Sequence, residues 1–203
     1  MDQMSAWESF YRNNNRPWRG VSKVDDLPFP EGSHVLELGC GNGKTAIALT
    51  EMGLKVTGVD FSKSAIDMCS DIKGDVEFIC SRVDSLPCSD DSFDGALAFH
   101  VLEHLDDKEL KDAVSELRRV VKGGGHILIK VFSRNDMRSE KGESIDEGTF
   151  VRGNGIRYHY YTEEELIDAF SPMGCASILT VDETTRFGTM RSRIFADFLN
   201  PID

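Results

Sequence analysis

The feature that most constrains this chain is a short run in which an apolar stretch passes into three alternating glycines. Residues 35–43 read Val-Leu-Glu-Leu-Gly-Cys-Gly-Asn-Gly, and a helix-forming segment, 44–49, follows directly. This order predicts a strand, a tight turn and a helix start, where backbone N–H groups can approach a ligand closely. A second apolar run, 55–60, ends at Asp60, whose carboxylate can accept both hydroxyls of a ribose. We therefore predict a nucleoside-cofactor site.

The spacing of the glycines indicates which cofactor to expect. A dinucleotide fold needs G-x-G-x-x-G, but Lys44 stands where its third glycine belongs, which disfavours a dehydrogenase, and no P-loop motif is present. The stretch 37–43 instead resembles the E/D-x-G-x-G-x-G signature of class I S-adenosylmethionine-dependent methyltransferases. Three later segments resemble further motifs of that family in the same order: VTGVDFS at 56–62, SFDGALAFHVLEHL at 92–105 and GGGHILIK at 123–130. The resemblance extends over roughly residues 33–132.

The resemblance implies an α/β fold with a Rossmann-like, doubly wound, seven-stranded, mostly parallel sheet, an antiparallel final hairpin and helices on both faces. The sequence pattern agrees, because strand-like and helix-like segments alternate up to residue 132. Strands are predicted near 33–38, 55–60, 75–80, 93–99 and 125–132, a final hairpin at 175–182 and 190–199, and helices near 43–52, 62–72, 106–121 and 162–170. We expect one domain, 1–203, made of an N-terminal lid or helical segment (1–30), a cofactor-binding core (31–132), an insertion or substrate cover (133–161) and a C-terminal helix and hairpin (162–203).

The resemblance also implies the cofactor, S-adenosylmethionine, with S-adenosylhomocysteine as product. Asp60 is expected to hold the ribose, Glu37 to orient the methionine portion and the backbone of Val83 to meet the adenine edge. The expected cofactor-binding residues are Glu37, Gly39, Cys40, Gly41, Asn42, Asp60, Phe61, Ser62, Val83, Asp84 and Phe99. One position departs from the family pattern: Arg82 stands where many relatives have an aspartate that touches the adenine amino group. Either Asp84 substitutes for it or the contact is absent.

The segment His-Val-Leu-Glu-His at 100–104 is the main candidate for the acceptor side. His100 ends a predicted strand, and we expect it to be an acceptor-facing base, the predicted catalytic residue. H-x-x-E-H is also a zinc-protease motif, and some methyltransferases hold a divalent metal with E-x-x-E-H here. Because the segment follows a strand in a methyltransferase pattern and lacks the first glutamate, we expect neither a protease nor a metal ligand set.

Three tyrosines, Tyr11, Tyr158 and Tyr160, are candidates for substrate contact. Tyr11 belongs to an aromatic N-terminal segment that either packs on the sheet or forms a lid over the cofactor. Tyr158 and Tyr160 follow the polar stretch 133–156, which predicts either a disordered surface loop or a mobile substrate cover. Both pairs of alternatives remain open at this stage.

Composition bears on the methyl acceptor. The 23 Lys and Arg residues against 35 Asp and Glu leave a net charge of −12, which gives no general attraction for phosphate backbones. The N-P-P-Y-type motif of many amino-group methylating enzymes is missing. We therefore expect a small-molecule acceptor with an oxygen, sulfur or other soft nucleophile, and no direct nucleic-acid substrate. The alternatives are a partner-dependent methyltransferase acting on RNA or protein, and a non-catalytic cofactor-binding scaffold.

The sequence also bears on location. We find no signal peptide and no segment long and apolar enough to span a membrane, and therefore expect a cytoplasmic protein without membrane association. The oligomeric state is open.

Overall fold

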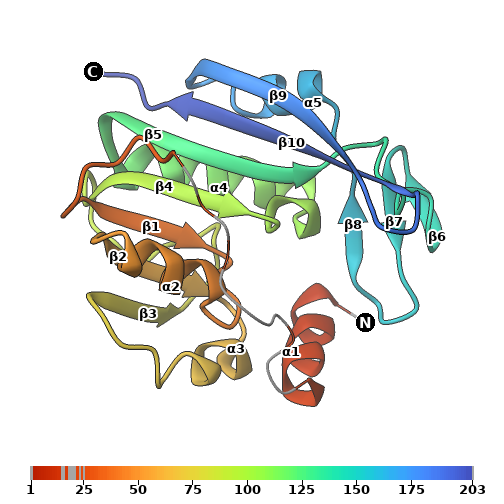
Figure 1. The fold of residues 1–203 in the computed structure, drawn as a ribbon, viewed down its shortest axis with the longest axis horizontal. Coiled ribbons are helices and arrows are strands. Elements are labelled where there is room, and N and C mark those ends of the chain that lie inside the picture. Colours follow the sequence, from red (N-terminus) through yellow and green to blue (C-terminus); the bar gives the residue numbers. More distant parts are fainter. Residues whose placement is uncertain (1, 15–16, 18–21, 23, 25, 203) are drawn as a thin grey trace.

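Seven strands form one sheet in the computed structural model, which describes residues 2–14, 17, 22, 24 and 26–202 (Figure 1). Their order across the sheet is β3-β2-β1-β4-β5-β10-β9. Their bounds are β1 His34–Leu38, β2 Lys55–Asp60, β3 Val76–Cys80, β4 Phe93–Phe99, β5 Val121–Phe132, β9 Gly174–Thr184 and β10 Met190–Leu199. The strands β1 to β5 pair in parallel, whereas β10 runs antiparallel to both of its neighbours. This arrangement confirms the predicted fold class, including the final hairpin.

Helices cover both faces of the sheet. They are α1 Gln3–Asn13, α2 Lys44–Glu51, α3 Lys63–Met68, the 3-10 helix η1 Leu102–His104, α4 Asp107–Val120 and α5 Glu163–Ala169. Figure 1 shows α2 and α4 on opposite faces. Leu36 and Leu38 of β1 pack with α4 and α5, whereas Val35 packs with α2, because successive strand residues point to opposite sides. No helix in the described ranges is long and apolar enough to cross a membrane.

The start of β5 differs from the prediction. The strand was expected to begin near residue 125, but β5 already begins at Val121. The reason is Asn200, which directly follows β10 and whose side-chain amide donates to the carbonyl oxygens of Val121 (2.6 Å) and Arg118 (3.0 Å). Its backbone exchanges hydrogen bonds with Gly124 and Gly125. A distant segment thus supplies hydrogen-bond partners for these glycines, of which Gly124 has a positive φ angle of 79°.

The insertion after β5 forms a small sheet of its own and is not a structureless loop. Its antiparallel strands are β6 Glu143–Asp146, β7 Thr149–Val151 and β8 Arg157–His159, in that order. The sheet stands at the carboxyl end of β5, beside the tip of the β9–β10 hairpin (Figure 1). Tyr160 and Ile156 are fully buried beneath it. The apolar residues that supply its core are few, which is why the polar composition suggested a loop.

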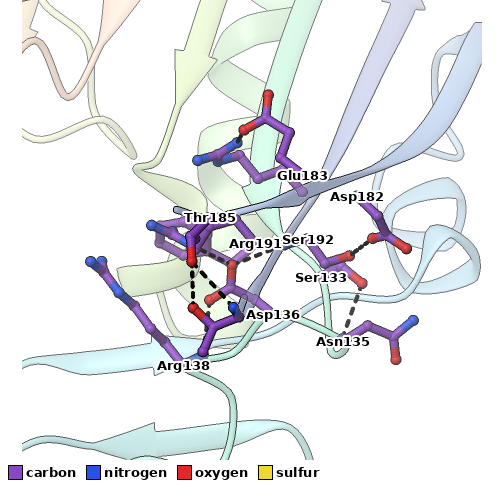
Figure 2. Close-up of polar contacts among 12 residues, drawn as sticks. Ser133, Asn135, Asp136, Arg138, Asp182, Glu183, Thr185, Arg191 and Ser192 are labelled. Atoms are coloured by element: carbon purple, nitrogen blue, oxygen red, sulfur yellow. Dashed lines mark hydrogen bonds and ion pairs between the residues drawn. The ribbon is translucent and has the colours of Figure 1, made fainter. Parts of the chain in front are cut away.

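Asp136 joins this insertion to the hairpin. Its carboxylate is buried and accepts hydrogen bonds from the Arg191 Nε (2.7 Å), the Ser192 N–H (3.0 Å) and the Arg138 N–H (2.9 Å), as Figure 2 shows. Ser192 in turn donates to Asp182 (2.6 Å). A buried carboxylate with charged and backbone donors resists rearrangement, because separating them leaves an unpaired buried charge.

The N-terminal helix α1 packs on α3 and the insertion. Ala6, Trp7 and Tyr11 form an apolar cluster with Ala65 of α3 and Ile156 of the insertion. The segment is therefore a helix, but it packs on α3 and the insertion and not on the sheet as one of the two alternatives proposed. The helix lies instead across the carboxyl ends of the first strands.

Candidate active site

A cleft opens at the carboxyl ends of β1, β2 and β4, where open parallel sheets bind ligands. It has an empty volume of about 690 Å³, which includes the open space at its mouth. Its walls are formed by Gln3, Met4, Trp7, Tyr11, Gly39, Asp60, Phe61, Arg82, Val83, Asp84, His100, Val101, His104, Leu105 and Glu109. The cleft thus combines the predicted cofactor turn, the β4 end and helix α1.

The glycine turn reaches the cleft at Gly39, and its glycines take a left-handed backbone conformation. Gly39, Gly41 and Gly43 have φ angles of 65°, 53° and 73°. At Gly39 a Cβ atom would lie 2.6 Å from Val101 Cγ2. Glycine is therefore required at this position both by its φ angle and by the close approach of Val101.

Asp60 ties this turn to the end of β2. The Gly41 N–H donates to its Oδ2 (3.0 Å) and the Ser62 N–H donates to its Oδ1 (2.9 Å). Burial raises the pKa of Asp60 to about 6 despite these two bonds. Each carboxylate oxygen has a second lone pair, so the group retains capacity for the two hydroxyls of a ribose.

Glu37 is buried beneath the turn with incomplete hydrogen bonding. It accepts from the Thr45 hydroxyl and the Ala46 N–H, while its Oε2 has no partner among the described residues. Burial raises its pKa to about 8. An orphaned carboxyl oxygen next to a ligand-facing turn is a suitable partner for an ammonium group, such as that of the methionine portion of S-adenosylmethionine. Together, Glu37 and Asp60 fit the predicted cofactor.

The loop after β3 is held by an ion-pair network. Arg82 Nε and Nη2 donate to the two carboxylate oxygens of Asp84 (2.7 and 2.6 Å), and Nη2 also contacts Glu109 (2.8 Å). The pKa of Arg82 is raised by these carboxylates. Arg82 therefore engages Asp84, the residue that was considered as the partner of the adenine amino group. Val83 lines the cleft.

Helix α1 closes one side of the cleft through polar contacts at its first residue and near its middle. Glu8 accepts from the hydroxyls of Ser64 (2.6 Å) and Ser62 (2.7 Å) at the start of α3. Gln3 donates to the Gly155 carbonyl (2.9 Å) and accepts from the Arg157 N–H (2.8 Å) of the insertion. The helix thus bridges α3 and the insertion above the cofactor turn.

The acceptor end of the cleft is built around His100. Its φ angle of 57° is unusual for a residue with a side chain. Its Nδ1 lies 2.9 Å from Glu103 Oε1, and its ring stacks on Phe132 at 4.4 Å. Glu103 is fully buried and also accepts from the Phe132 N–H (3.1 Å). These contacts orient the His100 ring at the cleft wall.

The second histidine of the motif has different partners. His104 Nδ1 lies 2.7 Å from the Arg157 carbonyl oxygen, and its ring packs against Trp7 and Tyr158. Burial lowers its pKa. Among the residues that the structure describes, no three His, Cys, Asp or Glu side chains are grouped to hold a metal ion.

The predicted site residues occupy three kinds of position. Those that line the cleft are Tyr11, Gly39, Asp60, Phe61, Val83, Asp84 and His100. Those that support it from behind are Glu37, Cys40, Gly41, Asn42 and Ser62, all buried. Phe99 packs on the α2 face of the sheet. Tyr158 contacts His104 from outside the cleft lining, and Tyr160 is fully buried with its hydroxyl donating to the Arg138 carbonyl.

Sequence reasoning did not assign several lining residues, among them Gln3, Met4, Trp7, Arg82, His104 and Glu109. Three of them carried a signal: Trp7 in the aromatic N-terminal segment, Arg82 in the adenine loop and His104 in the motif at 100–104. Gln3 lies far from the cofactor motifs in sequence, and Glu109 follows the motif at 92–105 by four residues; they enter the site through packing of α1 and α4.

Comparison with known proteins places these features in a family context. The family model described as a methyltransferase domain matches residues 36–129. The tRNA N(3)-cytidine methyltransferase METTL2 of Danio rerio is 32% identical over 169 residues, covering 74% of this chain and 47% of its own length. The tRNA N(3)-methylcytidine methyltransferase trm140 of Schizosaccharomyces pombe is 30% identical over 189 residues, covering 81% of this chain and 62% of its own length.

A solved structure supports the fold. A SAM-dependent methyltransferase from Methanosarcina mazei has a TM-score of 0.75 at 24% identity, covering 89% of this chain and 100% of that one. The chain spans about half the length of the curated relatives that it matches.

These relatives overturn two predictions: a small-molecule acceptor, and no direct nucleic-acid substrate. Net charge misled because it sums over the chain and does not say where the charges lie. The missing N-P-P-Y-type motif also misled, because it concerns planar exocyclic amines. The N3 atom of cytosine, named in these relatives, is a ring nitrogen with an in-plane lone pair.

Proposed function

Since this chain belongs to the class I S-adenosylmethionine-dependent methyltransferases, we propose that it methylates tRNA at the N3 atom of cytidine. The observation that carries the proposal is the similarity to curated tRNA N(3)-cytidine methyltransferases over most of this chain, at 30–32% identity. Because the chain spans about half the length of those relatives, its action on tRNA is tested both alone and in cell extract.

The cofactor half of the site follows from the buried carboxyls. Asp60 holds the ribose hydroxyls, and Glu37 receives the ammonium group through its unpartnered Oε2. When bound, S-adenosylmethionine supplies a sulfonium methyl group, to which the acceptor lone pair forms an N–C bond as the S–C bond breaks. The contribution of the protein to such a displacement is chiefly alignment. Helix α1 contributes by covering the cleft and excluding water.

The acceptor half requires orientation of a planar base. Cytosine N3 carries no proton in the neutral base, so no residue of this chain has to remove one. A Glu103 carboxylate oxygen can only accept, so the neutral His100 ring carries its hydrogen on Nδ1 and keeps a lone pair on Nε2. We assign Nε2 as acceptor for the cytosine amino group, which adjoins N3. His100 is then a base-contacting residue and not a general base.

The direct test is incubation of the protein with S-adenosylmethionine and total tRNA, followed by digestion and mass-spectrometric detection of 3-methylcytidine. The wild type should form it and Asp60→Ala should not. The assay is run in buffer and in an extract of cells lacking the gene, which provides a missing partner. A wild type that binds S-adenosylhomocysteine yet forms no 3-methylcytidine in either condition contradicts the proposal.

A further inference from the structure

Three arginines gather where the insertion meets the β9–β10 hairpin. We call Arg138, Arg152 and Arg191 the arginine cluster. Arg191 pairs with Asp136, whose two oxygens also accept backbone donors. Tyr160 links the other two, because its hydroxyl accepts from Arg152 Nη2 (2.5 Å) and donates to the Arg138 carbonyl (2.8 Å). One carboxylate therefore directly contacts a cluster of three guanidinium groups.

Two members of the cluster have unused hydrogen-bonding capacity. Within the described part of the chain, neither Arg138 nor Arg152 forms an ion pair with a carboxylate, and Arg152 Nε is buried without a partner. Arg138 is exposed, and Figure 2 shows its side chain extending from the backbone with no contact drawn at its guanidinium. Desolvation, together with the charges of Arg191 and Arg152, lowers the pKa of Arg138. An anion placed here would relieve this repulsion and use the free donors.

The cluster is connected to the acceptor end of the cleft by two separate sets of ring contacts. The Arg191 guanidinium lies over the Phe132 ring at 5.0 Å, and that ring stacks on His100 at 4.4 Å. The Arg152 guanidinium lies over the Tyr158 ring at 3.9 Å, and Tyr158 packs on His104 at 4.8 Å. Both histidines line the cleft. An anion at the cluster would therefore adjoin the group that receives the methyl.

We propose that Arg138 and Arg152 bind a backbone phosphate of the RNA next to the nucleotide that enters the cleft. This subsite rests on the proposed function and deepens it. The rings of Phe132 and Tyr158 lie between the arginines and the cleft. Rings at this position suit an RNA nucleotide, in which a sugar and a base separate the phosphate from the atom that is methylated. Arg191, neutralised by Asp136, fixes the position of the pair.

The test measures tRNA binding by wild type and Arg138→Gln over a range of salt concentrations. The Arg138 side chain has no hydrogen bond or ion pair with another described residue, so the fold should be retained, and an unchanged affinity for S-adenosylhomocysteine verifies this. Loss of one phosphate contact should weaken binding by about tenfold and reduce the slope of log K against log salt by about 1. Arg138→Lys, which keeps the charge, should retain the slope.

The matched control is Lys55→Gln, which removes one exposed positive charge at the amino end of β2, the end of that strand opposite the cleft. It should leave both affinity and slope as in the wild type. If Arg138→Gln behaves like Lys55→Gln while the wild type methylates tRNA, the subsite is refuted and the proposed function stands. If the wild type neither binds nor methylates tRNA, in buffer or in extract, both proposals fail.

Discussion

Replacing Glu8 by glutamine should release helix α1 from the cleft. Hydrogen bonds from Ser64, followed by those from Ser62, lower the pKa of Glu8 from 4.5 to about 2. At 1.36 kcal/mol per pK unit the difference corresponds to about 3.4 kcal/mol. The side chain is 27% exposed, and glutamine keeps one acceptor oxygen, so we reduce the expected loss to about 1–2 kcal/mol.

Hydrogen exchange of the α1 amides is the appropriate assay, because the loss is local and should appear as faster opening of this helix. A loss of 1–2 kcal/mol predicts exchange about five- to thirtyfold faster, with weaker binding of S-adenosylhomocysteine. Glu51→Gln, the same change at an exposed residue of α2, is the matched control. Unchanged α1 exchange in Glu8→Gln would refute the reasoning.

The pH dependence of the same contact has a defined sign. Because the folded-state pKa of Glu8 is the lower one, its contribution is complete above pH about 4.5 and disappears as the pH falls toward 2. Protection of α1 should decline over this range in the wild type more than in Glu8→Gln.

Three further predictions concern the cleft. Gly39→Ala should cost about 1–3 kcal/mol of unfolding free energy, measured by denaturation, and should abolish cofactor binding, measured by calorimetry. The control is Gly32→Ala, where φ is positive but no atom lies within 4 Å of the added Cβ, so this variant should show the cost of backbone strain alone. Affinity for S-adenosylhomocysteine should fall as the pH drops through about 6, because only ionised Asp60 accepts two ribose hydroxyls; a step that persists in Asp60→Asn would contradict this. His100→Asn should lower kcat/KM for tRNA by about tenfold or more, while equal loss of cofactor affinity would argue against a base contact.

The cofactor turn was predictable because its determinants are local. Alternating glycines between an apolar strand and a helix encode the left-handed angles observed at Gly39, Gly41 and Gly43. Asp60 was predictable for the same reason, since it ends a strand adjacent in the sheet. The order of strands and helices likewise follows from patterns within single segments, and hence the fold class.

Charge and composition were weaker guides, because they average over residues that the fold separates. The acidic total concealed the arginine cluster, which draws Arg138, Arg152 and Arg191 from three segments. The polar insertion was expected to be either a loop or a cover, but buried Tyr160 and the Asp136 contacts to the hairpin give it a small sheet. None of these contacts lies within one stretch of sequence.

The amino-acid sequence by itself determined the family, the fold class and the cofactor turn, because each depends on residues close together in the chain. Only the tertiary structure decided how the cleft is closed and what lies at its acceptor end. Glu8 meets Ser62 and Ser64, Gln3 meets Arg157, and Arg82 engages Asp84 together with Glu109. Most of these pairs join distant segments, so their formation depends on the packing of the whole chain and not on local preference.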